Sequence, residues 1–376
     1  MSGKTEAPAP HRVSVLELFF DLVFVFAITQ VTSLLASDLT LVGLGRGLLV
    51  LALLWWSWVA YAWLTNTISE QDTTTRLTIF VAMVAMLIAS LAVPGALGGD
   101  AVLFMSAYAV VRVLHVALYA LVARGSPQFL RGVLRLAAPL LVAVGLLLAG
   151  SFVDGTPRWV LWGMALALDY SGPLLAGTKG WSVDVGHFVE RQGLIVIIAL
   201  GEAIVSIGVG AGGLALDRLT VGSAILGGAI ACLMWWTYFD ALADSAEHAL
   251  SRVPADEQVA AVRDGYSYFH LPIVAGIVLL ALGVKKSLAH ADHHLELVPA
   301  IGLLGGLGLF LLGEVLFQRR VSGTIAWPRL LLGLAALAAV PLLGTHAGAF
   351  ALLAAIAAAL LLLVIAERAT GARSHG

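Results

Sequence analysis

The chain has 376 residues, of which 60% are hydrophobic and only 12% are Asp, Glu, Lys or Arg, and its mean hydropathy is +0.97. A soluble domain carries about 25% charged residues, so this composition excludes a soluble enzyme and a disordered protein and predicts an integral membrane protein. The net charge of −2 gives no reason to expect nucleic-acid binding, which needs a basic surface, and the single Cys232 excludes a disulfide framework or a cysteine-based metal site within one chain.

Twelve apolar stretches can each cross a membrane, since a spanning helix needs about 20 mostly apolar residues. We expect an all-α fold with helices over residues 14–36, 42–65, 77–97, 101–123, 134–153, 158–177, 188–210, 220–243, 266–287, 297–318, 327–345 and 347–367. Residues 1–13 form a predicted disordered tail, and residues 368–376 form a C-terminal tail. With the N-terminus inside, fifteen of the 21 Lys and Arg residues fall in inside segments and five in outside ones. Both termini are therefore predicted to be cytoplasmic.

Two tryptophan-rich runs suggest an internal duplication. The run Trp-Trp-Ser-Trp at 55–58 and the run Trp-Trp-Thr-Tyr at 235–238 are 180 residues apart. Because six helices return the chain to its starting side, the sequence predicts two parallel six-helix halves, 14–177 and 178–367. The alternative is that both runs are ordinary interfacial anchors.

Nine titratable side chains lie within the predicted spans, where a charge costs about 2.5–3.5 kcal/mol. Each must therefore face the protein interior, a partner or water. They are the acids Glu17, Asp21, Asp169, Glu202, Asp240 and Glu314, together with Arg112, His115 and His270. The excess of acids over a single intramembrane Arg predicts a pathway for protons or cations.

The first stretch carries two of these acids. Glu17 and Asp21 are four residues apart and share one helix face. Two carboxylates so close favour holding one proton between them, which indicates a proton relay or a cation site. The alternative is that Glu17 is solvated at the cytoplasmic end.

The fourth stretch carries a polar stripe. Tyr108, Arg112, His115 and Tyr119 follow one another on one helix face. Arg112 stays charged and needs a carboxylate partner, for which every buried acid is a candidate. A structural ion pair between two helices is the competing interpretation.

The sixth and seventh stretches contain two further acids. Asp169 precedes Gly172 and Pro173, where a broken helix would free carbonyl groups that could coordinate a cation; a plain kink is the alternative. Glu202 lies near mid-span and is a central candidate. Arg191, on nearly the same face as Glu202, is expected to snorkel to the inner interface.

The remaining candidates lie in the second half. Asp240 follows Trp236 by four residues at the start of an acidic stripe, so a functional and a solvated role are equally compatible with its position. His270 stands before Pro272, where a satisfied polar residue is more common than a ligand. Glu314 lies in a glycine-rich helix, and small residues permit the close packing that would bury it.

Several of these segments together resemble the bacterial low temperature requirement protein A (LtrA) family. The resemblance rests on Glu17-Leu-Phe-Phe-Asp21 through Thr29, Asp169 with Gly172-Pro173, His187-Phe-Val-Glu190-Arg191 through Gly201-Glu202, Trp235-Trp236 with Phe239-Asp240, and His270-Leu271-Pro272. It covers most of the chain and departs from the family pattern at Gln192, where an aromatic residue is expected. The resemblance implies a multi-pass protein of the bacterial plasma membrane but no settled biochemical activity.

The segment from Phe20 to Thr29 is also similar to the Phe-Ser-Asp signature in the first helix of lysosomal potassium channels and their bacterial relatives. This chain has Phe in place of Ser, and the seventh stretch lacks the signature. The likeness implies a cation pathway but does not establish potassium selectivity.

These observations lead to one main hypothesis and two alternatives. The main hypothesis is a cation- or proton-linked transporter or channel that uses intramembrane carboxylates, with no cofactor and no metal site. The alternatives are a structural or regulatory membrane protein linked to the envelope or to growth in the cold, and an intramembrane lipid-modifying enzyme. The predicted partners are the lipid bilayer and a proton, a monovalent cation or a small solute; a homo-oligomer is compatible with the sequence.

Overall fold

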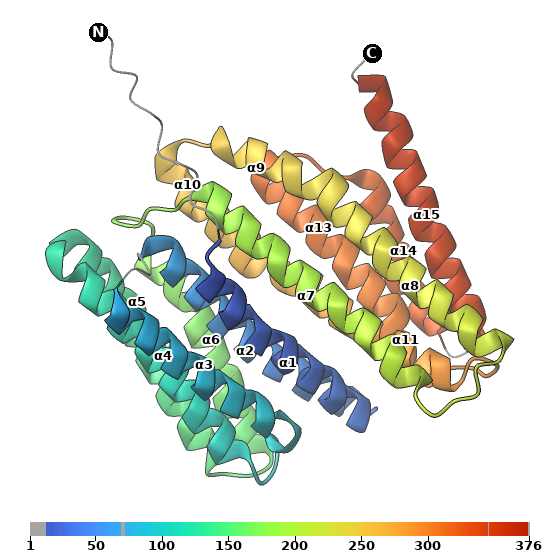
Figure 1. Ribbon diagram of the computed structural model, residues 1–376, viewed down its shortest axis with the longest axis horizontal. Coiled ribbons are helices and arrows are strands. Elements are labelled where there is room, and N and C mark those ends of the chain that lie inside the picture. The colour runs from blue at the N-terminus through green and yellow to red at the C-terminus, as the bar shows by residue number, and fades with distance from the viewer. Residues whose placement is uncertain (1–12, 69–71, 345, 375–376) are drawn as a thin grey trace.

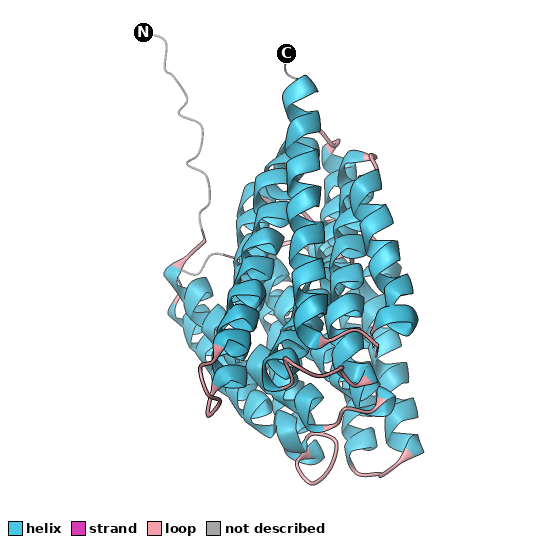
Figure 2. Ribbon diagram, turned by 90° about the vertical axis from the view of Figure 1, so that its right-hand side faces the viewer, coloured by secondary structure: helices cyan, strands magenta, loops and turns pink. Residues whose placement is uncertain are grey.

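The computed structural model describes residues 13–68, 72–344 and 346–374, and the regular structure throughout these ranges is helical (Figures 1 and 2). One isolated antiparallel bridge joins His294 to Gly348. The predicted all-α fold is therefore confirmed. The predicted disordered tail lies outside the described residues except for Val13.

The first half contains six long helices. They are α1 (Val15–Ser37), α2 (Leu41–Thr67), α3 (Thr73–Ala92), α4 (Ala101–Val122), α5 (Pro127–Ser151) and α6 (Thr156–Ala176), with the short 3₁₀ turns η1 (Val93–Gly95) and η2 (Ala123–Gly125) after α3 and α4. Side chains that accept a backbone N–H begin most of them. Ser14 forms a capping box with Glu17 at the start of α1, and Asp72 caps α3.

The second half is longer and less regular. It contains α7 (Val185–Ala211), α8 (Arg218–Tyr238), η3 (Phe239–Ala243), α9 (Asp244–Ser251), α10 (Ala255–Val262), η4 (Arg263–Tyr268), α11 (His270–Ala289), α12 (Leu297–Ala300), η5 (Ile301–Gly305), α13 (Gly306–Ser322), α14 (Trp327–Leu343) and α15 (Ala349–Ser374). The segments η3, η4 and η5 are π-helical. They let one helical run continue into the next, so the run that contains α11 begins at Ala255 and not near residue 266.

Ten helices or helical runs in the described chain are long and apolar enough to cross a membrane. Each of the twelve predicted stretches overlaps a helix, but α6, which carries Arg158 and Asp169, is not among the ten, and α14 has only 17 residues. The described chain begins and ends toward the same end of the bundle (Figure 1). A count of twelve spans and the cytoplasmic location of that end stay predictions.

The helices form two groups around a shared centre. Figure 1 shows α3, α4, α5 and α6 on one side and α8, α13, α14 and α15 on the other, with α1 and α7 packed together between them. The apolar windows of α2 and of the α11 run are each 78% buried, whereas that of α8 is 33% buried. Many large apolar side chains on the outer helices are exposed, as a lipid-facing surface requires.

The two tryptophan runs have different surroundings. Trp55, Trp56 and Trp58 of α2 are buried, whereas Trp235 of α8 is 46% exposed. Residues 237–238 of the second run are buried, so within that run Trp235 faces the surface, whereas the tryptophans of the first run belong to the protein core. The duplication of the two halves stays a prediction.

Candidate functional site

Two acids of α1 face two basic residues of α7. The Oε2 atom of Glu17 lies 3.0 Å from Nε2 of His187, and Nη2 of Arg191 donates to Oδ1 of Asp21 at 3.0 Å. The indole N–H of Trp58 donates to the same Asp21 oxygen at 2.9 Å. We name Glu17, Asp21, His187 and Arg191 the α1–α7 cluster; all four side chains are buried.

The cluster confirms that Glu17 and Asp21 share a face, and it corrects two expectations. Glu17 is 3% exposed and therefore not solvated. Arg191 is fully buried and does not snorkel to the interface, because the carboxylates of Glu17 and Asp21, 3.5 and 3.0 Å from its terminal nitrogens, supply its counter-charge inside the protein.

The hydrogen bonds of Asn66 orient the imidazole ring of His187. The backbone N–H of Asp184 donates to Oδ1 of Asn66, so the Asn66 amide nitrogen faces the Asp184 carbonyl at 2.9 Å and Nδ1 of His187 at 3.1 Å. An amide nitrogen only donates, hence Nδ1 of His187 accepts. Nε2 is the ring nitrogen of His187 that faces Glu17.

Beside the imidazole of His187, the cluster contains two carboxylates and one guanidinium. Oε1 of Glu17 and Oδ2 of Asp21 are buried and have no hydrogen-bond partner within the described chain. A net buried charge is costly. The geometry therefore suits the uptake of one proton or one monovalent cation.

Glu202 lies further along the same helix pair. It is 4% exposed and contacts two hydroxyl groups, Oγ of Ser206 at 3.0 Å and Oγ1 of Thr29 at 2.5 Å. The Thr29 oxygen is also 3.1 Å from the carbonyl of Val25, and its one proton cannot serve both acceptors. The Thr29 hydroxyl donates to the Glu202 carboxyl group, and the Val25 carbonyl competes for the same proton. In the described ranges no basic side chain forms an ion pair with Glu202.

Asp169 is the partner of Arg112. Nη2 of the guanidinium lies 2.7 and 2.9 Å from the two carboxylate oxygens, and both side chains are buried. The expectation of a broken helix beside Asp169 is wrong, because α6 continues through Pro173 to Ala176. The carbonyl of Pro173 accepts from Arg263 at 3.3 Å and that of Tyr170 from Tyr268 at 2.6 Å.

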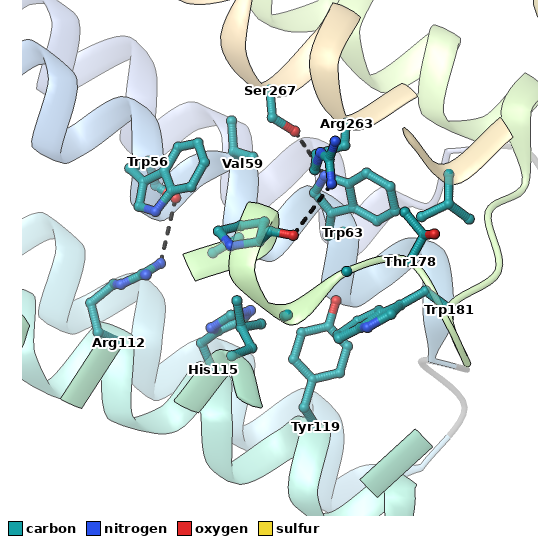
Figure 3. Close-up of a pocket in the computed structure, with 16 residues that line it drawn as sticks. Trp56, Val59, Trp63, Arg112, His115, Tyr119, Thr178, Trp181, Arg263 and Ser267 are labelled. Atoms are coloured by element: carbon teal, nitrogen blue, oxygen red, sulfur yellow. Dashed lines mark hydrogen bonds between the residues drawn. The ribbon is translucent and has the colours of Figure 1, made fainter. Parts of the chain in front are cut away.

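His115 and Tyr119 follow Arg112 on α4 and border a cavity of about 80 Å³ (Figure 3). The predicted stripe is confirmed, since Tyr108, Arg112, His115 and Tyr119 are all buried. The cavity lies between the first half and the segment α10–η4, which contributes Arg263 and Ser267 to its wall.

Glu314 belongs to a separate ion-pair network. Its Oε2 atom lies 3.1 Å from Nη1 of Arg329. The Nε and Nη2 atoms of Arg329 donate to the two carboxylate oxygens of Glu367 at 2.7 and 2.8 Å. Glu314 is fully buried, as its glycine-rich helix predicts. Arg329 and Glu367 were not predicted as partners, because both stand near helix ends where charged residues are commonly solvated.

Asp240 and His270 have simpler surroundings. Asp240 is exposed and lies in η3, beyond the end of α8, so its assignment to the membrane interior is corrected. Hydrogen bonds from Trp236 and Arg368 hold the pKa of its carboxyl below the ordinary value. His270 is buried, and its two nitrogens contact the carbonyl of Gly265 at 3.0 Å and the hydroxyl of Tyr238 at 2.7 Å. It is a satisfied polar residue, as expected.

Comparison with known proteins identifies the family. The model of the bacterial low temperature requirement A protein (LtrA) family matches residues 12–366. The chain belongs to the LtrA family. This confirms the resemblance, whose motifs in α1 and α7 supply all four residues of the α1–α7 cluster. The LtrA chain is also similar to an uncharacterized protein of Rhizobium meliloti (strain 1021), with 33% identity over 329 residues. The aligned region covers 84% of this chain and 78% of the relative. No solved structure matches it.

Proposed function

We propose that this LtrA protein is a proton- or cation-linked transporter or channel of the bacterial plasma membrane. The observation that carries the proposal is Glu202, a buried carboxyl group that contacts only hydroxyl groups and pairs with no basic residue in the described ranges. A carboxylate in such surroundings is stable only when it binds a proton or a cation.

The charge balance of the fold narrows the pathway. Asp169 and Glu314 are paired with Arg112 and Arg329. The excess of buried acids over buried basic residues is therefore smaller in the structure than the sequence suggests, because these two acids have basic partners. Glu202 and the α1–α7 cluster, on one helix pair, keep the capacity to exchange a proton or a monovalent cation.

The proposal is tested by reconstituting the full chain in liposomes and recording proton and potassium flux under imposed gradients. Wild type is compared with Glu202→Gln, which keeps the shape of the side chain and removes its titration. Asp240→Asn is the matched control, because it makes the same kind of change at an exposed carboxylate. We expect flux in wild type and in Asp240→Asn, and flux at the protein-free background in Glu202→Gln.

Asp21→Asn extends the test to the α1–α7 cluster, where it leaves the Arg191 charge with Glu17 alone. We expect reduced flux in this variant at a folded yield matched to wild type. Absence of flux in well-folded wild type under every gradient would refute transport, and equal flux in all four proteins would remove Glu202 and Asp21 from the pathway.

A structural or regulatory membrane protein is the second candidate. The ion pairs Arg112–Asp169 and Arg329–Glu314 favour it, since both are buried and join different helices. This candidate predicts that Glu202→Gln lowers the folded yield without a separate loss of flux.

A further inference from the structure

The cavity beside α4 has a layered wall. Arg112, His115 and Tyr119 line it at successive turns of one helix, and Trp56, Trp63 and Trp181 add flat aromatic faces (Figure 3). The side chains of Arg112, His115 and Tyr119 are at most 2% exposed. Gly177, Thr178 and Arg263 are more exposed and form the rim. The cavity is therefore a pocket that opens between the α6–α7 connection and η4.

Hydrogen-bonding groups in this pocket have unused capacity. The hydroxyl of Tyr119, both ring nitrogens of His115 and Nε of Arg112 are buried without a well-formed hydrogen bond in the described chain. The Ala60 backbone lies near His115 and the Thr67 side chain lies near Tyr119, so each of these two groups has one neighbouring polar group. Arg Nε only donates, the Tyr hydroxyl donates and accepts, and a neutral imidazole has one donor and one acceptor, so all three residues can donate. A ligand that fills the pocket should therefore be an acceptor.

The sign of the charge points the same way. Arg112 and Arg263 line the pocket, whereas their carboxylate partners, Asp169 and Asp264, do not, and none of the lining residues is acidic. Aromatic walls alone would also suit an organic cation. Both guanidinium groups are compensated by their ion pairs with these partners, so the wall presents guanidinium N–H donors and no carboxylate, which favours an anionic acceptor over a cation.

The shape of the pocket limits the rest of the ligand. A volume of about 80 Å³ limits the ligand to a small molecule. The rings of Tyr119 and Trp181 meet edge to face with centroids 5.2 Å apart, and those of His115 and Tyr119 are 4.9 Å apart. These rings touch one another and form one continuous aromatic side of the pocket, against which a flat, apolar body can stack.

We propose that this pocket binds a small organic carboxylate with a flat, apolar body, whose carboxylate accepts hydrogen bonds from Tyr119 and His115 beside Arg112. The site is separate from Glu202 and does not depend on the proposed flux. Its position between the two halves means that an occupant would touch both α4 and η4.

The test measures binding to the purified full chain in detergent by titration calorimetry. Furan-2-carboxylate is the probe, because its planar ring and carboxylate contain eight non-hydrogen atoms; furfurylamine and furfuryl alcohol are the cationic and neutral counterparts. We expect wild type to bind furan-2-carboxylate and to bind the other two at least about tenfold more weakly, as loss of a charged hydrogen-bond acceptor implies.

Two variants locate the binding site. Tyr119→Phe removes one hydroxyl from the pocket and should weaken binding of furan-2-carboxylate about tenfold. Tyr108→Phe is the matched control, because its hydroxyl is also buried and unpartnered on α4 but does not line the pocket; we expect its affinity to equal that of wild type. Tighter binding of furfurylamine, no binding of furan-2-carboxylate to wild type, or equal losses in both variants would overturn the proposal.

Discussion

Arg112 and Asp169 show how this protein keeps charged residues inside an apolar bundle. The guanidinium contacts both carboxylate oxygens from a neighbouring helix, and its Nη1 lies 3.5 Å from the carbonyl of Trp56. The contacts between the two ions therefore replace the water that would hydrate each of them, and they hold both side chains in one geometry. Removing one partner leaves the other charge buried and uncompensated.

We expect Asp169→Asn to lower the stability of the folded protein by about 3–5 kcal/mol, the cost of breaking a buried ion pair. Thermal unfolding of the detergent-purified protein measures the loss. The double variant Arg112→Gln with Asp169→Asn should recover part of it, because no uncompensated charge is then left. An unchanged melting temperature in the single variant would show that water reaches Arg112.

At this scale, the sequence predicts which residues need partners but not which partners they find. Arg112 requires a carboxylate, yet Asp169 is 57 residues away and five other acids were equally available. Arg191 was expected to snorkel because it stands near the start of its helix, and only the packing of α1 against α7 places Asp21 beside it.

Helix α11 owes its central position to glycine. A Cβ atom on Gly276 would lie 2.5 Å from the backbone nitrogen of Phe310 and 2.7 Å from the carbonyl oxygen of Gly306. Gly283 faces Leu303 and Gly302 in the same way. Small residues therefore let the backbones of α11 and α13 touch. The van der Waals contact between them stabilises the helix pair in lipid, where no hydrophobic effect drives helices together.

We expect Gly276→Ala to destabilise the protein by about 1–3 kcal/mol, because the added methyl group meets backbone atoms that cannot move aside. Gly228→Ala on α8 is the matched control, since nothing lies within 4 Å of its added carbon. The control should be neutral or slightly stabilising, as alanine favours helix over glycine. Thermal unfolding of both variants checks this, and equal melting temperatures would contradict direct contact between the α11 and α13 backbones.

Element positions were largely predictable, whereas their irregularities were not. Every predicted stretch overlaps a helix because an apolar run of about 20 residues is a strong signal. The π-helical segments η3, η4 and η5 have no such signal. In η4, the extra residue precedes Pro272 and orients Arg263 and Ser267 toward the pocket, so the pocket could not be predicted from helix periodicity.

The whole molecule joins two halves through α1, α2, α7 and α11. The contacts Glu17–His187, Asp21–Arg191 and Thr29–Glu202 advance together along α1 and α7, so these two helices run parallel. A parallel pair at the centre suits two halves related by an axis along the membrane normal. The different burial of α2 and α8 shows that any such symmetry is incomplete.

The orientation in the membrane gives the last prediction. Asp256 and Asp292 are both exposed and lie near opposite ends of the helical run that contains α11. In a Cys232→Ser background, which removes the one native thiol, each is replaced by cysteine and treated with a membrane-impermeant maleimide in intact spheroplasts. Because Lys and Arg concentrate on the side of the termini, we expect labelling of Asp292→Cys from outside and of Asp256→Cys only after permeabilisation. The reverse pattern would invert the topology and place the pocket rim, Glu17 and His187 on the outer face, whereas labelling of both from outside would mean that this run does not cross the membrane.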